Sequence, residues 1–174
     1  MAHLELAHRL PETVPPPDDR ARFEQIVARH HRRLRQVAVA VTGDPDAVED
    51  VLQEGYYRAY RRLPRRFEGE DGEAKWLYRI VYNCAIDEIR RRKRRAEVAT
   101  GEPQLVAVGD DAVRRLSEQQ AFRSLAPADR AVLLLVDDFG FDSHTAARIL
   151  GLPRGTVAWR LGKARRKFHE ALDA

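Results

Sequence analysis

The sequence predicts an all-α protein of two small helical domains. Apolar residues recur at spacings of three and four, and proline and glycine are concentrated between these stretches. With 174 residues, 44% of them hydrophobic, the chain can fill modest cores rather than one large core. We therefore expect a flexible leader over 1–19, a first domain over 20–95, a flexible acidic linker over 96–111 and a second domain over 112–174.

The first domain is expected to begin with two helices. Apolar spacing predicts one helix over 20–41, which Thr42-Gly43 closes. Asp44-Pro45-Asp46 is typical of a helix start, with an N-cap, a proline at the first position and an acid in the first turn. This second helix should run to about Leu63. One proline and two glycines in the stretch 63–73 then predict a loop.

A third helix is predicted over 76–95, with the sequence WLYRIVYNCAIDEIRRRKRR. Its apolar stripe should face the core; the stripe comprises Trp76, Leu77, Ile80, Val81 and Cys84. Six consecutive basic residues, 90–95, extend beyond the stripe. Like charges one turn apart repel and weaken a helix unless a polyanion neutralises them, so nucleic acid is the predicted partner. A solvated charged face is the alternative.

The second domain is predicted to end in a helix-turn-helix. Apolar spacing indicates a short helix over about 113–125, and a second helix that starts near Pro127 and ends near Gly140. Asp142-Ser143 can cap the next helix, which Gly151-Leu152-Pro153 closes with a sharp turn. The last helix, 154–171, is basic on its outer face, as in the second helix of a DNA-binding helix-turn-helix.

Charge and composition limit the possible functions. Net charge is only +4, and basic and acidic residues form separate clusters, which suggests one polyanionic and one basic partner. Cys84 is the single cysteine, which excludes an intrachain disulfide and indicates a small core residue. The histidines lack metal-ligand spacing and no glycine-rich phosphate loop occurs, so we expect no metal, no cofactor and no enzyme activity. No apolar run of membrane-spanning length and no signal pattern is present, which predicts a cytoplasmic protein without membrane insertion.

Three ordered motifs carry a resemblance to a known family: AVEDVLQEGYYRAY, WLYRIVYNCAIDEIRRRKRR and LGLPRGTVAWRLGKARRKF. Together they resemble the sigma-70 family, and specifically the extracytoplasmic-function (ECF) class of bacterial sigma factors. The resemblance covers roughly 20–95, which corresponds to sigma region 2, and 116–172, which corresponds to region 4. It implies a protein without catalytic activity that binds core RNA polymerase, places it at promoters and opens the DNA. It also implies an anti-sigma protein as a partner.

The resemblance further implies two surfaces on the first domain. The acids of the second helix resemble the surface that docks on the clamp helices of the largest polymerase subunit; they are Glu49, Asp50, Gln53 and Glu54. The loop and third helix resemble the part that reads the melted strand of the minus-ten element, where a base is turned out into a pocket. The implied contacts are Arg65, Arg66, Phe67, Arg79, Tyr82, Asn83, Asp87, Arg90 and Arg91. Tyr78 and Tyr82 either stack on bases or pack at the domain edge.

The helix-turn-helix resembles the part that reads the minus-thirty-five element as duplex. The implied contacts are Arg154, Thr156, Ala158, Trp159, Arg160, Lys163 and Arg166. The sequence departs from the family here, because Ala158 and Trp159 stand where a basic residue and a serine are common. Trp159 therefore has three possible roles: contact with DNA, packing between helices, or contact with a protein. The linker has two, as an RNA mimic inside the polymerase or as a plain tether.

Two other functions fit parts of the sequence. One is a free-standing helix-turn-helix regulator that binds duplex DNA, with the first three helices as an oligomerisation or sensing module. The other is an interaction protein that uses only its acidic helix. Specific transcript starts from core polymerase and a promoter library, in the presence of this chain, distinguish the sigma hypothesis from both.

Overall fold

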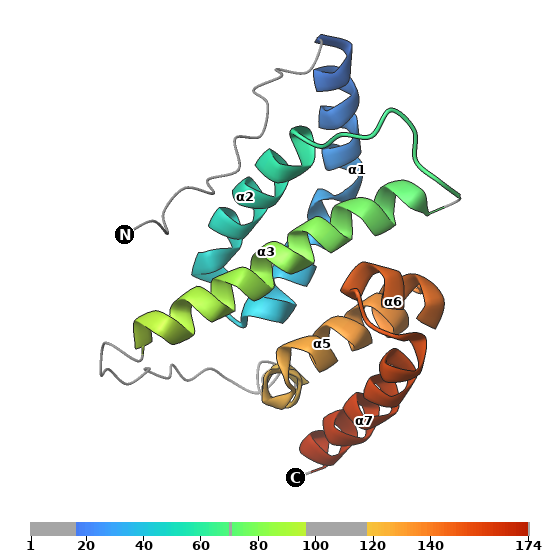
Figure 1. Cartoon of the computed structure of the whole chain (residues 1–174). Helices are drawn as coiled ribbons and strands as arrows, with labels where there is room; N and C mark the ends of the chain where they lie inside the picture. Colours follow the sequence, from blue (N-terminus) through green and yellow to red (C-terminus); the bar gives the residue numbers. More distant parts are fainter. Residues whose placement is uncertain (1–16, 70, 97–117, 174) are drawn as a thin grey trace, which may run out of the picture.

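The structure is a computed structural model that describes residues 17–69, 71–96 and 118–173, and every regular element in them is helical (Figure 1). The N-terminal half, residues 17–96, holds α1 (Pro17–Thr42), a 3-10 turn (Pro45–Ala47), α2 (Val48–Tyr60) and α3 (Gly72–Ala96). The C-terminal half, residues 118–173, holds a helical stretch over 118–124, α5 (Pro127–Leu133), a π-helical turn (Leu134–Asp138), α6 (Ser143–Leu150) and α7 (Arg154–Leu172). The predicted all-α fold class is confirmed. Most of the predicted leader, and the linker after Ala96, lie outside the described residues.

Helix ends in the N-terminal half follow local turn chemistry. α1 begins at Pro17, inside the predicted leader, because proline is tolerated at the first helical position. The carboxylate of Asp44 accepts a hydrogen bond from the backbone N–H of Asp46 at 2.8 Å, which confirms the predicted cap. α2 ends at Tyr60, before the predicted Leu63, because its last turn tightens: the N–H of Arg62 bonds the carbonyl of Ala59 at 3.0 Å.

The core of the N-terminal half forms where α3 packs across α1 and α2 (Figure 1). Leu77, Val81 and Cys84 of the predicted stripe are buried, whereas Trp76 and Ile80 are half-buried. Burial raises the pKa of the Cys84 thiol, as expected for a small core residue without thiolate chemistry.

α2 and α3 approach each other closely at Gly55. A Cβ atom at Gly55 would lie 3.0 Å from Cγ2 of Val81 and 3.6 Å from its Cα. Because the second atom belongs to the backbone of α3, a larger residue at Gly55 has to push the two helices apart. The close approach positions α2, and with it the acids of the predicted docking surface, against α3.

Replacing Gly55 by valine is expected to lower the free energy of unfolding by about 1–3 kcal/mol, because the added methyl groups overpack the α2–α3 contact. Urea denaturation followed by circular dichroism measures this change. Gly155→Val is the matched control, since a Cβ at Gly155 meets no atom within 4 Å. An equal loss in both variants would show that packing at Gly55 is not the cause.

The C-terminal half contains the predicted helix-turn-helix. The carboxylate of Asp142 accepts the backbone N–H of Thr145 at 2.7 Å, which caps α6 and confirms the predicted cap. Gly151 ends α6 with φ 66°, a left-handed conformation that favours glycine. α7 then buries Val157, Leu161 and Ala164. The helix predicted to end near Gly140 is continuous, but it widens into the π-helical turn after Leu133.

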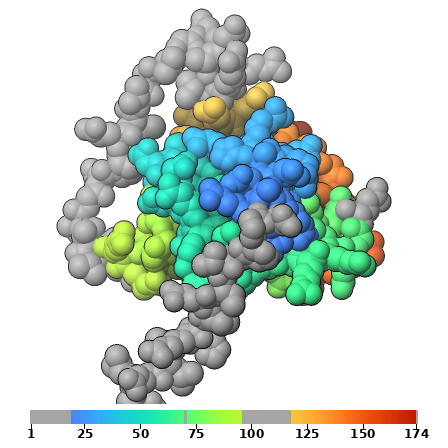
Figure 2. Space-filling view, turned by 90° about the horizontal axis from the view of Figure 1, so that it is seen from above, coloured from blue at the N-terminus to red at the C-terminus, as the bar shows by residue number. Residues whose placement is uncertain are grey.

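The two halves pack against each other. One buried cluster includes residues of both, and α3 contacts α6 while α1 contacts α5. Tyr78 of α3 lies at this contact, with its ring centroid 6.0 Å from that of Phe139 and 5.7 Å from that of Phe141. Figure 2 shows α1 and α2 side by side in blue and cyan, with orange parts of the C-terminal half against them.

None of the helices that the structure describes is both long enough and apolar enough to cross a membrane.

Candidate nucleic-acid and polymerase interfaces

A pocket of about 280 Å³ lies where the loop after α2 meets the start of α3. The predicted minus-ten residues Arg66, Phe67 and Arg79 line it together with Trp76. Arg65 is exposed on the same loop but does not line the pocket. Arg148 of α6 also lines the pocket, so the C-terminal half reaches this site in the present arrangement.

Phe67 is held in place by its neighbours in the pocket wall. Its ring centroid lies 5.3 Å from that of Trp76, and the guanidinium of Arg22 lies 5.3 Å from the Phe67 centroid. The resemblance implied Phe67 as a minus-ten contact, but stacking on bases was predicted only as one of two roles for Tyr78 and Tyr82. The half-buried ring of Phe67 supplies an aromatic surface at the pocket.

The outward face of α3 carries the other predicted minus-ten residues. Arg79 and Asn83 are exposed and lie one turn apart. Asp87, one turn further on, accepts a hydrogen bond from Arg58 of α2 at 3.2 Å and lies 3.7 Å from Arg90. Asp87 is therefore part of an ion-pair network between α2 and α3. Arg90 and Arg91 are exposed beyond it.

Tyr82, also a predicted minus-ten contact, is turned away from this face. It is 7% exposed, and burial raises the pKa of its hydroxyl. Tyr78 is fully buried, and burial raises its pKa to about 12. Of the two roles predicted for this pair, packing is the one that the structure shows. In this arrangement the structure does not bring Tyr82 together with Asn83 and Arg79.

The predicted docking acids lie on the outer face of α2. Glu49, Asp50 and Gln53 are exposed, while Glu54 accepts a hydrogen bond from Arg58 at 2.6 Å. Asp50, Gln53 and Glu54 line one side of a groove of about 430 Å³, with Arg91 on its other side. The surface is therefore acidic along α2 and basic at the end of α3.

The predicted minus-thirty-five residues of α7 divide into two groups. Arg154, Ala158, Trp159 and Arg166 are exposed, and Thr156 is half-buried. Arg160 and Lys163 instead turn toward Asp129 of α5, which is 1% exposed. Nη1 of Arg160 donates to Oδ1 of Asp129 at 2.7 Å, and Nζ of Lys163 lies 3.6 Å from Oδ2. These two cations therefore attach α7 to α5 within the C-terminal half.

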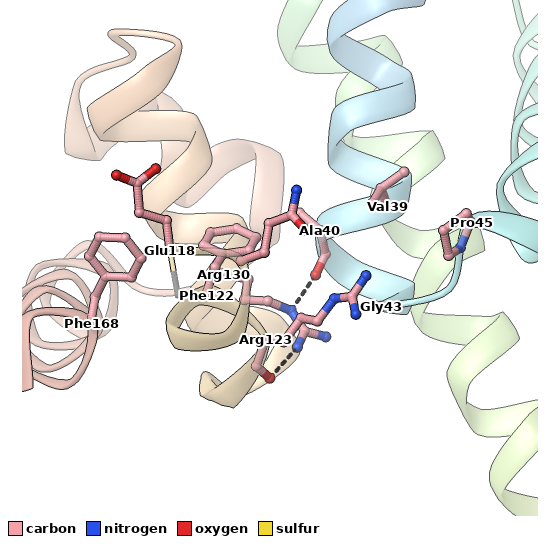
Figure 3. Close-up of a pocket in the computed structure, with 10 residues that line it drawn as sticks. Val39, Ala40, Gly43, Pro45, Glu118, Phe122, Arg123, Arg130 and Phe168 are labelled. Carbon is pink, nitrogen blue, oxygen red and sulfur yellow. Dashed lines mark hydrogen bonds between the residues drawn. The ribbon is translucent and has the colours of Figure 1, made fainter. Parts of the chain in front are cut away.

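Arg130 of α5 joins the two halves of the molecule (Figure 3). Its guanidinium donates to the carbonyls of Ala40 and Val41 in the last turn of α1, the latter at 3.0 Å. It also donates to the carbonyls of Arg123 at 3.0 Å and Leu125 at 3.1 Å. α1 has no basic residue in its own last turn, so Arg130 supplies the cation that its carbonyl end favours.

Sequence reasoning missed Arg130 and Asp129, both buried charged residues in an otherwise apolar stretch. The two adjacent charges in an apolar stretch were the signal that could have identified them, since a charged residue within a buried helix requires a partner of opposite charge or hydrogen bonds. Nothing in the neighbouring sequence identifies which residues those partners are.

Within the described residues, no group of three or more histidine, cysteine or acidic side chains is placed to hold a metal ion.

Comparison with known proteins gives two family matches. The family model of sigma-70 region 2 matches residues 26–95, and that of sigma-70 region 4 matches residues 112–168. A curated ECF RNA polymerase sigma factor, SigM of Mycobacterium tuberculosis, is 31% identical over 155 residues, or 88% of this chain and 79% of SigM. SigW of Bacillus subtilis is 31% identical over 172 residues, or 88% of this chain and 90% of SigW.

Two solved structures share the arrangement of helices. CnrH in complex with the cytosolic domain of CnrY matches with a TM-score of 0.61 at 26% identity, over 88% of this chain and 89% of that one. RpoE of Bartonella quintana, in complex with the anti-sigma factor NepR, matches with a TM-score of 0.71 over 88% and 98%. At 23% identity this second likeness shows the fold alone. The two family matches and the curated relatives together show that the chain belongs to the ECF class of the sigma-70 family.

Proposed function

We propose that this chain is an alternative sigma subunit that binds core RNA polymerase through α2 and directs it to promoters through α3 and α7. The observation that carries the proposal is the division of charge: Glu49 and Asp50 of α2 are exposed, and two basic helices, α3 and α7, present other exposed faces. Such a division suits one basic protein partner and one nucleic acid. The chain would act as a specificity subunit without catalytic chemistry of its own, in the cytoplasm.

The minus-ten element is expected to meet the pocket at the start of α3. Arg66, Phe67 and Arg79 supply cations and an aromatic ring there, and Asn83 adds an amide that both donates and accepts. Turning a base out of the stack costs a few kcal/mol, which stacking and hydrogen bonds in a pocket offset. Tyr82 is buried in this arrangement, so it would take part only after a rearrangement that exposes it.

The minus-thirty-five element is expected to meet α7 as duplex. A helix of this kind lies in the major groove with its first residues near base edges and flanking cations near phosphates. Arg154 and Arg166 are exposed at suitable positions along α7. In keeping with these roles, we assign residues 20–95 to the polymerase and minus-ten module, 112–174 to the minus-thirty-five module and 96–111 to the connection between them.

An anti-sigma protein is a further proposed partner. RpoE of Bartonella quintana, a protein of similar fold, is known in complex with the anti-sigma factor NepR. CnrH, also of similar fold, is known in complex with the cytosolic domain of another protein, CnrY. The close packing of the two halves described above is compatible with a state of the chain that is not bound to DNA.

Transcription with reconstituted holoenzyme tests the proposal. Core polymerase, with and without this chain, is given a promoter library, and transcript starts are mapped. Starts at specific sequences that depend on the chain would support it. Tight binding to duplex DNA without any binding to core polymerase would overturn it, and would favour the free-standing regulator.

Asn83→Ala is expected to reduce discrimination at one base of the minus-ten element while leaving core binding unchanged. Without its amide, residue 83 no longer hydrogen-bonds the edge of the extruded base. Polar groups of that base then lack partners, which reduces the free-energy difference between the correct and an incorrect base by about 1–3 kcal/mol. Transcription from templates substituted base by base measures it. Arg62→Ala, at an exposed position of the preceding loop, is the control. An equal loss at every base would contradict a pocket that reads one base.

A further inference from the structure

The exposed face of α7 carries an unusual apolar residue at its centre. The side chain of Trp159 is 60% exposed. Among the described residues, the other exposed large hydrophobic side chains are those of Val39 and Tyr57. Nζ of Lys163 lies 5.0 Å from the centroid of the Trp159 ring, a cation–π contact. The indole therefore does not pack between helices, which was one of its three predicted roles.

Glycines flank Trp159 on the same face of α7. Gly155 lies one turn before it and Gly162 one turn after it, and Arg166 follows one turn later. At about 100° per residue these four positions fall within an arc of roughly 60°. A Cβ atom at Gly155 would meet no atom within 4 Å, and one at Gly162 would meet only Nη1 of Arg166 at 3.8 Å.

Packing within the protein thus does not require glycine at either position. Glycine inside a helix costs about 1 kcal/mol relative to alanine, so its presence needs another reason. Without Cβ atoms, the backbone of α7 can approach another molecule closely on both sides of Trp159. The indole then projects from a shallow surface into whatever the helix meets.

The neighbouring charges suit a nucleic acid and hold the indole in place. Arg154, Arg166 and Lys167 are exposed around this face. Lys163 is anchored by buried Asp129 at 3.6 Å, and its ammonium group covers one side of the ring. Arg160 is also held by Asp129, which leaves Trp159 as the large side chain that faces outward at the centre.

The chemistry of indole selects among base edges. Tryptophan offers an apolar ring and one N–H donor, with no acceptor. In the major groove, thymine presents a C5-methyl group beside the O4 acceptor, whereas cytosine presents an amino donor. Thymine is the base that matches both features of the indole.

We propose that Trp159 is a specificity-determining residue that reads thymine in the minus-thirty-five duplex. Its ring contacts the C5-methyl group and its Nε1–H faces O4, while Gly155 and Gly162 let the groove approach the helix. This inference rests on the proposed function, in which α7 reads duplex promoter DNA.

The first experiment uses holoenzyme and a promoter library randomised over the minus-thirty-five element. Wild-type chain is expected to select thymine at one position or two adjacent positions, and W159S is expected to lose that preference. Start-site specificity and minus-ten preferences should persist in W159S. An unchanged thymine preference in W159S would overturn the proposal.

The second experiment replaces each selected thymine by deoxyuridine, which lacks only the methyl group. The wild-type holoenzyme is expected to bind the uracil promoter about fourfold more weakly, the factor for one buried methyl group. W159S should bind both promoters equally. W159F should keep the methyl effect, because it retains a ring, and should discriminate less well against cytosine, because it lacks the N–H.

The outcomes separate the two proposals. Equal wild-type binding to thymine and uracil promoters at every selected position would overturn the role of Trp159 while the sigma function stands. A wild-type holoenzyme without specific starts would instead overturn the proposed function, and this inference with it.

Discussion

Replacing Arg130 by methionine is expected to lower the free energy of unfolding by about 3 kcal/mol. Arg130 is 7% exposed, and its guanidinium donates hydrogen bonds to carbonyls of both halves. Methionine retains an apolar stem of similar length but no donor. The carbonyls of Ala40 and Val41 would then remain buried without this partner, and each such group costs about 1–3 kcal/mol.

The arrangement of the two halves should change as well. Arg130 supplies positive charge to the carbonyl end of α1, where the helix dipole favours a cation. Without it, the contact between α1 and α5 is weakened, and the radius of gyration in small-angle scattering is expected to rise. Urea denaturation and scattering on the same sample measure both effects.

Arg123→Met is the matched control for this prediction. Arg123 and Arg130 line one pocket of about 550 Å³ (Figure 3), but Arg123 is exposed whereas Arg130 is buried. The variant removes the same charge and should change the free energy of unfolding by less than about 0.5 kcal/mol. Equal destabilisation by the two substitutions would mean that charge, rather than the hydrogen bonds of Arg130, is responsible.

The helices and their ends could be predicted from the sequence because their causes are local. Asp142 caps α6 with a backbone N–H three residues away, and Gly151 ends it with its own left-handed conformation. The positions of Asn83 on the outer face of α3 and Asp50 on α2 follow from the same helical periodicity.

Contacts between distant segments could not be predicted in this way. The carbonyl of Ala40 lies 90 positions from Arg130 in the chain, and nothing near either residue marks the other. The resemblance implied that Arg160 contacts DNA, which stays a prediction, but nothing near Arg160 in the sequence marks the hydrogen bond that its guanidinium donates to buried Asp129. Tyr82 is 7% exposed although the resemblance implied that it contacts DNA, and helical periodicity does not show how distant segments pack around α3.

Charge reversal on α2 is expected to weaken binding to core polymerase at least tenfold. In the D50K/E54K double variant, two acids of the proposed docking surface become cations, which would face the basic partner with like charge. Replacing attraction by repulsion at an interface charge pair costs more than about 1.4 kcal/mol, the equivalent of a tenfold change. Titration of labelled chain with core polymerase, in the absence of DNA, measures the affinity.

Glu54 also holds Arg58, so the stability of the double variant has to be measured beside its affinity. D50K alone is the cleaner variant, because Asp50 is exposed on the outer face of α2. E170K/D173K is the matched control for the double variant, and E170K alone is the matched control for D50K, since each control makes the same change in net charge at exposed positions near the end of α7. Because screening by salt weakens attraction between exposed charges, the difference between wild type and D50K should shrink as ionic strength rises. If D50K binds core polymerase as tightly as E170K at low salt, Asp50 does not belong to the interface.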